Sequence, residues 1–324
     1  MRYRLARAED LNAYEEILEP GFRASPHVRH RLIDIWRTLL LEDRALFVTF
    51  EDEYEPRTIE AAAITSFAQE TFVHGYLKNP RPYLAAEVYE KILGGRSPLL
   101  TPQEVRAANS GRGLEFIALH FMLRHPDLDD PRTQEVLMAA NAAFFFFHHG
   151  YRMNSILQEV YGRDKADYLE NAGFRPLDDF ADYFALRADE PPDPKDHPYL
   201  LRLGKEDIVP AAVTPLSFLF HPRPTRIYFS TAERKVLERA LLGQSDEELS
   251  ASLGVSVDTI KMTWRRVYQR VDREMPQLLG SDAARKQSPS RGSEKRRRLL
   301  DYLRNHLEEL RPAVKPSTRE AQHT

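Results

Sequence analysis

The chain has 324 residues, of which 42% are hydrophobic and 29% are charged, and its formal net charge is −3. This length exceeds what one hydrophobic core normally supports, so we expect about two domains. The sequence has no cysteine, which excludes disulfides and thiolate metal sites and favours the cytoplasm. Its N-terminus lacks the pattern of a signal peptide and no apolar run is long enough to span a membrane, so we expect no membrane partner.

Charge is distributed unevenly along the chain. From residue 230 onward there are 19 Lys and Arg against 14 Asp and Glu, whereas the preceding residues carry 27 against 35. A basic C-terminal third joined to an acidic N-terminal part is typical of a nucleic-acid-binding module fused to another domain. Modest surpluses of positive charge also occur on ordinary solvated surfaces, so the charge distribution alone does not establish nucleic-acid binding.

Residues 1–187 alternate between predicted strands and helices. In chain order we expect a strand at 3–7, helices near 9 and at 25–42, a hairpin at 45–50 and 59–67, a helix at 83–93, a central strand at 114–123, a helix at 131–149, a strand at 151–160, a helix at 163–171 and a last strand at 180–186. This alternation predicts an α/β domain.

Two polar stretches divide the rest of the chain. Residues 188–228 are rich in proline and are predicted as a linker and connecting segment. Residues 280–293 are predicted as a second linker, which joins an all-α module at 229–279 to a basic amphipathic helix at 294–311.

Residues 229–279 carry the pattern of a helix-turn-helix. The pattern consists of two capping boxes, a glycine turn and an apolar stripe at helical spacing: Ser230 with Glu233, Ser245 with Glu248, Gly254, and then Ile260, Trp264, Val267 and Val271. A short helix, a tight turn and a longer amphipathic helix are the parts of this motif.

The outward face of the third helix of this module carries the predicted DNA contacts. Opposite the apolar stripe lie Asp258, Met262, Arg265 and Gln269, with Lys261 and Arg266 flanking that face and Thr259 at the helix N-terminus. Such side chains can read base edges in a major groove, and a helix N-terminus can bind a phosphate. A solvated helix in a small bundle would present the same residue types.

Residues 229–271 resemble the LuxR-type DNA-binding domain across its first three helices, without a gap. The matching positions are Ser230, Glu233, Val236, Leu237, Gly243, Ser245, Glu248, Leu249, Leu253, Ser256, Thr259, Ile260, Lys261 and Tyr268. The resemblance implies a transcription regulator that binds double-stranded DNA, with Thr259 at a phosphate and Lys261 and Arg265 facing the groove. Thr263 and Trp264 depart from the family, which often has His and Leu at these positions. The pattern is also similar to the promoter-binding region of sigma factors, but no other sigma region precedes it.

The order of elements over residues 1–187 resembles the GNAT acyltransferase fold, a mixed sheet with flanking helices. Residues 168–174 are similar to the closing helix-to-strand segment of that family. In the family, amides of a glycine-containing loop hold the pyrophosphate of acetyl-CoA. The equivalent residues 125–134 have no glycine and three aspartates, and the position of the usual catalytic phenol falls on Leu169, next to Tyr168.

We therefore predict no catalytic residue and no cofactor in this domain. It would instead sense a small-molecule ligand or bind a protein partner. The alternative is an acetyl-CoA-dependent acyltransferase that its helix-turn-helix tethers to DNA. A third possibility, an autoinducer receptor, would require an aromatic and aspartate pattern that this part of the sequence lacks.

Other residues of the N-terminal domain suggest weaker possibilities. His120, His125, His148 and His149 raise the question of a metal, but adjacent histidines point to different faces, so we predict none. The phenylalanines at 144–147 are expected in the core, or around an apolar ligand pocket. Glu115 and Glu159 could serve as acid and base, although surface or ion-paired carboxylates are the simpler interpretation.

The final helix at 294–311 begins with a basic cluster and continues with a leucine stripe, made of Leu299, Leu300, Leu303, Leu307 and Leu310. We expect the stripe to contact a second copy of the chain and form a homodimer, with packing onto its own module as the alternative. The basic cluster would neutralise about three or four phosphates.

Overall fold

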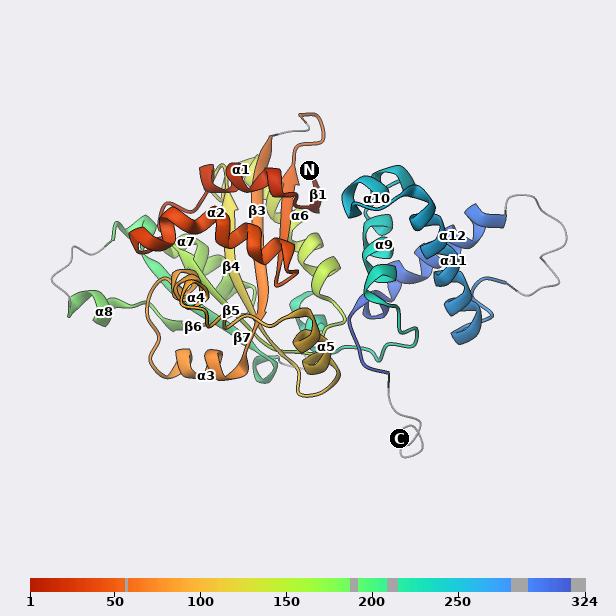
Figure 1. Ribbon diagram of the computed structural model, residues 1–324. Helices are drawn as coiled ribbons and strands as arrows, with labels where there is room; N and C mark the ends of the chain where they lie inside the picture. Colours follow the sequence, from red (N-terminus) through yellow and green to blue (C-terminus); the bar gives the residue numbers. More distant parts are fainter. Residues whose placement is uncertain (56–57, 187–191, 209–214, 281–290, 316–324) are drawn as a thin grey trace. The chain divides into compact units, whose positions relative to one another are not determined.

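The computed structural model describes residues 1–55, 58–186, 192–208, 215–280 and 291–315. The chain divides into two compact units (Figure 1). The N-terminal unit comprises Met1–His148 and Arg152–Phe220, and the C-terminal unit comprises His149–Tyr151 and His221–Thr324. The predicted division into an α/β domain and a helical domain therefore agrees with the structure, although the boundary differs.

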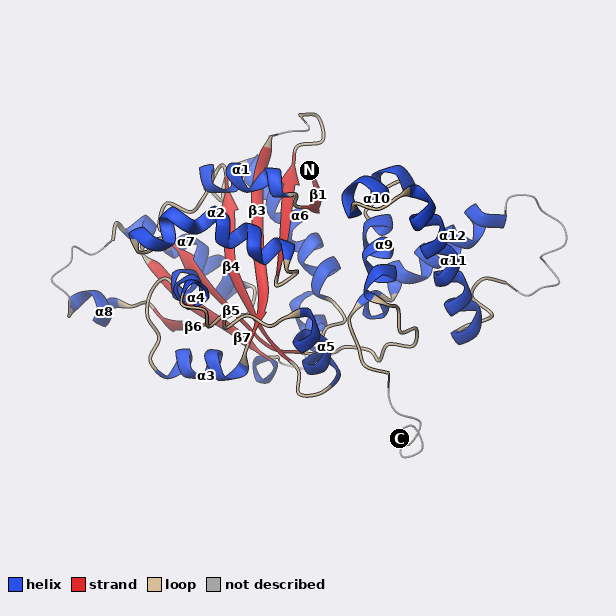
Figure 2. Cartoon of the chain, in the orientation of Figure 1, coloured by secondary structure: helices blue, strands red, loops and turns tan. Residues whose placement is uncertain are grey.

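A mixed β-sheet forms the centre of the N-terminal unit (Figure 2). Its strands are β1 (Arg2–Leu5), β2 (Ala45–Glu51), β3 (Ile59–Ala68), β4 (Leu114–Leu123), β5 (Met153–Tyr161), β6 (Arg175–Asp178) and β7 (Pro198–Gly204), in the spatial order β1-β2-β3-β4-β5-β7-β6. Strands β4 and β5 pair in parallel and all other neighbours pair antiparallel. This mixed α/β sheet follows the order of elements expected from the sequence resemblance.

Helices cover both faces of this sheet. In chain order they are α1 (Leu11–Glu16), α2 (Pro26–Leu41), α3 (Glu70–Lys78), α4 (Leu84–Leu93), α5 (Pro102–Ser110), α6 (Pro131–His148), α7 (Arg163–Asn171) and α8 (Ala181–Ala185). Helices α1, α2 and α4 pack into the main hydrophobic core on one face. Helices α6 and α7 lie on the other face (Figure 2). There, Phe144 of α6 packs edge-on against Phe116 of β4.

Strand β4 shows how the sequence places side chains on the two faces. Phe116 points to α6, and Ile117, the next residue, belongs to the core with α2 and α4, as alternation along a strand requires. A bulge opposite Ile64 and Thr65 interrupts the pairing with β3, so Leu119 and His120 both lie on the α2 side. The predicted strand at 114–123 is confirmed with the same bounds.

The C-terminal unit is helical. It contains α9 (Thr231–Leu241), α10 (Asp246–Leu253), α11 (Val257–Glu274) and α12 (Arg291–Asn305), followed by a 3-10 turn at Leu307–Leu310. Both predicted capping boxes are present at the starts of α9 and α10. Gly254 ends α10 with a φ of 64°, a left-handed conformation that favours glycine. The predicted sequence of short helix, glycine turn and longer helix is confirmed.

The end of the N-terminal unit corrects two sequence predictions. Strand β7 lies within the segment 188–228 that was predicted as a linker, and the unit continues to Phe220, not to residue 187. Prolines obscured the strand, although Leu200, Leu201 and Leu203 are buried. Residues 187–191, at the start of that linker, lie outside the described residues.

The predicted last strand at 180–186 is also wrong. The strand is β6, which ends at Asp178, and residues Ala181–Ala185 form α8. The Asp178 carboxylate accepts a hydrogen bond from the Phe180 amide at 2.7 Å, a turn that ends the extended chain. Helices α3 and α5 were not predicted. None of the helices in the described ranges has an apolar stretch sufficient to cross a bilayer.

Candidate nucleic-acid interface and N-terminal cavities

The buried side of α11 agrees with the sequence analysis. Ile260, Trp264, Val267 and Val271 are all buried, so the predicted helical phase is confirmed. At the start of the helix the Ser256 hydroxyl accepts a hydrogen bond from the Thr259 amide at 3.2 Å. The remaining face of α11 is therefore the one that a partner can reach.

All six predicted DNA-contact residues lie on that accessible face. Thr259, Lys261, Met262, Arg265, Arg266 and Gln269 are exposed. Three of them are cations, and none of the three forms an ion pair with any described residue. By contrast, the half-buried Arg270 on the same helix donates to the Glu233 carboxylate at 3.0 Å. The outward face of α11 thus presents three cations without an ion pair among the described residues and one exposed carboxylate, Asp258, a net positive charge that attracts phosphate.

A cluster around Trp264 fixes the angle between α10 and α11. The indole N–H of Trp264 donates to Asp246 in the first turn of α10 at 3.2 Å. Arg296 of α12 donates to the same carboxylate at 2.8 Å, and its guanidinium lies 4.5 Å from the centre of the indole ring. Sequence reasoning missed Arg296, because the contact joins residues 50 positions apart and no local pattern signals it.

Helix α12 corrects the predicted dimer contact. Its stripe is buried inside the C-terminal unit: Leu299 and Leu303 are 0% exposed, and Leu300, Leu307 and Leu310 are also buried. Helix α12 packs on α9, so the alternative of packing onto its own module holds. The leucines are therefore covered without a second copy of the chain. Most of the predicted second linker at 280–293 lies outside the described residues, and α12 begins at Arg291.

The basic cluster at the start of α12 is largely neutralised by carboxylates. Lys295 lies 3.8 Å from Asp272, and Arg296 pairs with Asp246 as described above. Arg297 and Arg298 both bind Glu294, at 2.9 and 2.8 Å, and these hydrogen bonds lower the pKa of Glu294 to about 2. This pairing weakens the expected contact of the cluster with three or four phosphates.

In the loop between β4 and α6, aspartate carboxylates accept hydrogen bonds from backbone amides of the same loop. The Asp130 carboxylate accepts a hydrogen bond from the Arg132 amide at 2.7 Å, and Asp127 accepts one from the Asp129 amide at 3.0 Å. Amides of this kind would have to point at a pyrophosphate in order to hold it. The aspartates therefore occupy backbone donors as well as adding negative charge.

The two candidate acid–base residues of the sheet are not exposed and form no ion pair with any residue that the structure describes, contrary to the simpler interpretation. Glu115 is buried and accepts hydrogen bonds from Ser155 and from Asn154. Glu159 accepts hydrogen bonds from the Tyr83 amide at 2.8 Å and from the Tyr161 hydroxyl at 2.9 Å, and burial raises its pKa to about 7. It lies at a cavity of about 580 Å³, named here the Glu159 cavity.

The histidines considered for a metal site do not come together. The His120 Nδ1 lies 2.9 Å from the Glu19 carboxylate, whereas His148 lies beside Thr65, 3.2 Å from its hydroxyl, and His125 lies 3.8 Å from Glu60. Within the ranges that the structure describes, no three His, Asp or Glu side chains are placed to hold a metal ion. His120, His148 and His125 each lie beside a local structural partner instead.

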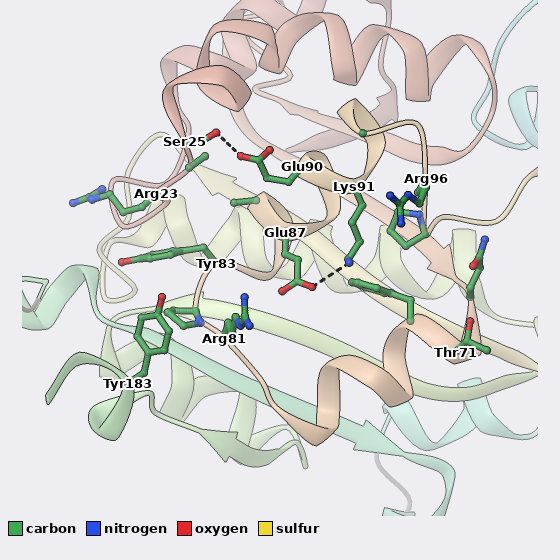
Figure 3. Close-up of a pocket in the computed structure, with 17 residues that line it drawn as sticks. Arg23, Ser25, Thr71, Arg81, Tyr83, Glu87, Glu90, Lys91, Arg96 and Tyr183 are labelled. Carbon is green, nitrogen blue, oxygen red and sulfur yellow. Dashed lines mark hydrogen bonds and ion pairs between the residues drawn. The ribbon is translucent and has the colours of Figure 1, made fainter. Parts of the chain in front are cut away.

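Two further cavities lie in the N-terminal unit. An open one of about 870 Å³ beside α4 carries side chains of both signs, among them Arg23, Glu87, Glu90 and Lys91 (Figure 3). Lys91 lies 3.6 Å from Glu87. The other measures about 430 Å³ and lies between the sheet and helices α6 and α7; it is named here the apolar cavity. Several phenylalanines of α6 line the apolar cavity, as one of the two sequence-based interpretations expected.

No protein-family model and no curated protein matches this sequence. Solved structures match it at low similarity. The C-terminal condensation domain of Ebony in complex with beta-alanyl-dopamine is 12% identical, with 63% of this chain and 98% of that chain covered and a TM-score of 0.38. An agmatine N-acetyltransferase mutant in the apo form is 12% identical, with 62% and 98% covered and a TM-score of 0.34.

A third solved structure is described as histone acetyltransferase HPA2 and related acetyltransferase from Corynebacterium glutamicum. It is 11% identical, with 62% of this chain and 93% of that chain covered and a TM-score of 0.33. Similarity at this level assigns neither an activity nor a ligand to the chain.

Proposed function

We propose that the chain is a sequence-specific transcription regulator that binds double-stranded DNA through α11. One observation carries the proposal: the six predicted contact residues of α11 are all exposed, and three of them are cations with no ion pair among the described residues. The LuxR-type resemblance of residues 229–271 supports the same conclusion. A major groove admits a helix that presents such a face.

The residues of this face would make different contacts with DNA. Lys261 and Arg265 would donate to base edges, where Arg and Lys most often contact guanine. Thr259 would bind a phosphate together with the free amides of the first turn of α11. Met262 and Gln269 would lie against neighbouring bases, and Arg266 would add a backbone contact. Trp264 and Arg296 would hold α11 at a fixed angle to α10 without touching DNA.

The test is selection of bound sequences from random double-stranded DNA, followed by affinity measurements on the selected site. Lys261→Ala and Arg265→Ala should each lose about 1–3 kcal/mol of specific binding. Arg273→Ala is the matched control, because Arg273 is an exposed cation of the same helix that pairs with Glu274. If both test variants bind as tightly as the control, α11 is not the recognition helix.

We further propose that the N-terminal unit senses a ligand or protein partner and does not catalyse a reaction. The aspartate-filled loop before α6 supports this view, because it leaves no free amide cradle at residues 127–132. The second candidate, an acetyl-CoA-dependent acyltransferase, is favoured only by the Glu159 cavity with its buried carboxylate. Calorimetry of the full chain with acetyl-CoA distinguishes the sensor from the enzyme. Binding at micromolar acetyl-CoA would favour the acyltransferase.

A cytoplasmic homodimer completes the proposal. Since the leucines of α12 are buried within their own unit, the dimer contact has to involve another surface. Light scattering of the full chain tests it, and a monomer mass at micromolar concentration would remove the homodimer from the proposal while leaving DNA binding by α11 unaffected.

A further inference from the structure

We propose that the N-terminal unit binds a small, uncharged and mostly apolar molecule in the apolar cavity between the sheet and helices α6 and α7. The cavity measures about 430 Å³, and every residue that lines it belongs to the N-terminal unit. An engineered apolar cavity of roughly 150 Å³ holds one benzene molecule, so this space fits a molecule of roughly two or three rings. The regulatory meaning of this site rests on the proposed function, whereas binding itself does not.

Alanines on facing walls create the hollow. Ala63 and Ala118 lie on the sheet, Ala140 and Ala143 on α6, and Ala172 just after α7. Larger side chains at these positions would fill the space, as they do on the opposite face of the sheet around Trp36 and Tyr89. An apolar hollow in a protein core is destabilising in proportion to its volume. A bound apolar molecule would remove that cost and explains why the small side chains are tolerated.

Aromatic side chains make up much of the remaining wall. They come from β2, β4, α6 and the residue just before β6: Phe50, Phe121, Phe144, Phe145, Phe147 and Phe174. Such a wall offers large apolar area and ring faces, which favour an aromatic or hydrocarbon occupant. The apolar side chains of helix α6 therefore pack on the sheet and line the cavity at the same time.

The apolar cavity and the neighbouring Glu159 cavity differ in the charge of their linings. No Asp, Glu, Lys or Arg side chain lines the apolar cavity. The Glu159 cavity, by contrast, is lined by charged residues of both signs, including Asp127, Asp164 and Lys165. Since an uncompensated charge is costly to transfer into an apolar site, the apolar cavity excludes carboxylates and phosphates. The two cavities adjoin, because Phe121, Leu137 and Tyr168 line both, but whatever occupies the apolar cavity itself is therefore neutral.

A few polar groups can orient the occupant. His148 Nδ1 donates to the Phe144 carbonyl at 2.8 Å, so Nε2 accepts from the Thr65 hydroxyl at 3.2 Å, and the two side chains satisfy one another. The Gln158 side chain lines the cavity and forms no hydrogen bond to any described residue, so its amide is open to a ligand. One polar group on an otherwise apolar molecule matches this arrangement.

The mouth of the cavity lies between α6 and α7. Asn141 is exposed, and Phe145 and Tyr168 are each 37% exposed. The Asn141 side-chain amide donates to the Tyr168 hydroxyl at 3.3 Å, which joins the two helices across the opening. A ligand can enter here by separating this single hydrogen bond.

The test uses N-phenyl-1-naphthylamine, an uncharged aromatic probe whose fluorescence rises in apolar surroundings. Titration of the full chain should show saturable binding at one site and a higher melting temperature. Ala143→Leu should weaken probe binding by about tenfold or more, because the added carbons occupy the site. Ala142→Leu is the matched control, since Ala142 is the exposed neighbour on the same helix and does not line the cavity.

Ala118→Leu fills the cavity from the sheet side and keeps the test valid if Ala143→Leu does not fold. We expect 1-naphthamide to displace the probe and 1-naphthoate, its charged analogue, to fail. Absence of saturable probe binding, equal binding by wild type and both filling variants, or equal displacement by the charged analogue would overturn the proposal. These measurements contain no DNA, so their failure is distinguishable from failure of the DNA-binding proposal.

Discussion

Helices α11 and α12 are both rich in Lys and Arg, yet they offer different amounts of charge to a partner. On α11, Lys261, Arg265 and Arg266 have no ion pair within the described part of the chain. On α12, each residue from Lys295 to Arg298 lies within 4 Å of a carboxylate. The comparison teaches that a count of basic residues overstates the charge available to DNA unless the neighbouring acids are known.

The largest effect should come from removing α12 altogether. Deleting residues 292–324 exposes the apolar surface that Leu299 and Leu303 now cover, and each buried leucine stabilises by roughly 1.5–3 kcal/mol. We expect circular dichroism to show that the C-terminal unit melts at a markedly lower temperature. Light scattering should show no change of oligomeric state. A folded, equally stable unit that changes from dimer to monomer would instead make α12 a dimer contact.

Trp264→Ala should have the next largest effect, on stability. Trp264 is 5% exposed and bonds to Asp246 beneath Arg296, and loss of a buried Trp costs roughly 3–5 kcal/mol. Urea denaturation of the full chain measures the loss. Trp264→Phe serves as the control that keeps an aromatic ring without the indole N–H. A Trp264→Ala variant that unfolds like wild type but loses DNA affinity would place Trp264 at the DNA surface.

The third prediction compares the two helices directly through salt dependence. Arg265→Ala should lower the slope of log affinity against log salt concentration by about one, since it removes an unpaired cation. Arg298→Ala should lower the slope by less, because Arg298 is already bound to Glu294 at 2.8 Å. Fluorescence anisotropy on one DNA site over a salt series gives both values. Equal decreases would mean that DNA displaces Glu294 from Arg298.

The smallest expected effect is an increase in non-specific DNA affinity. Glu294→Gln should free Arg298, whereas Arg297 keeps Asp301 at 3.4 Å, so non-specific DNA affinity at low salt should rise about two- to fivefold. Glu294→Asp, which keeps the charge, is the control. Since the pKa of Glu294 is about 2, this pairing should not change between pH 5 and pH 8. Unchanged affinity would show that α12 lies away from bound DNA.

Local features of the fold were predictable from the sequence. The capping boxes at Ser230 and Ser245 and the phase of α11 depend on residues three or four positions apart, so the pattern is sufficient. Strand β4 was predictable because a long apolar run bounded by polar residues leaves few alternatives. The exposed face of α11 follows directly from its buried face.

Features that depend on distant residues were not predictable. Strand β7 begins at Pro198 in a proline-rich segment, and only its pairing with β5 and β6 makes it a strand. The pairing of Arg296 with Asp246 and the burial of the α12 leucines need the tertiary structure. The alanines of the apolar cavity are likewise unremarkable until the strands and α6 are placed around them.

The position of β7 has a consequence for the synthesis of this chain. Strand β6 is made before β7, but in the sheet β7 lies between β5 and β6 and pairs with both. Until Gly204 has left the ribosome, β5 therefore has an unpaired edge and β6 has no neighbouring strand. Such open edges can pair with other chains. A nascent chain that stalls between residues 162 and 198 would therefore be prone to aggregation, and an isolated fragment that ends at residue 187 would share that defect.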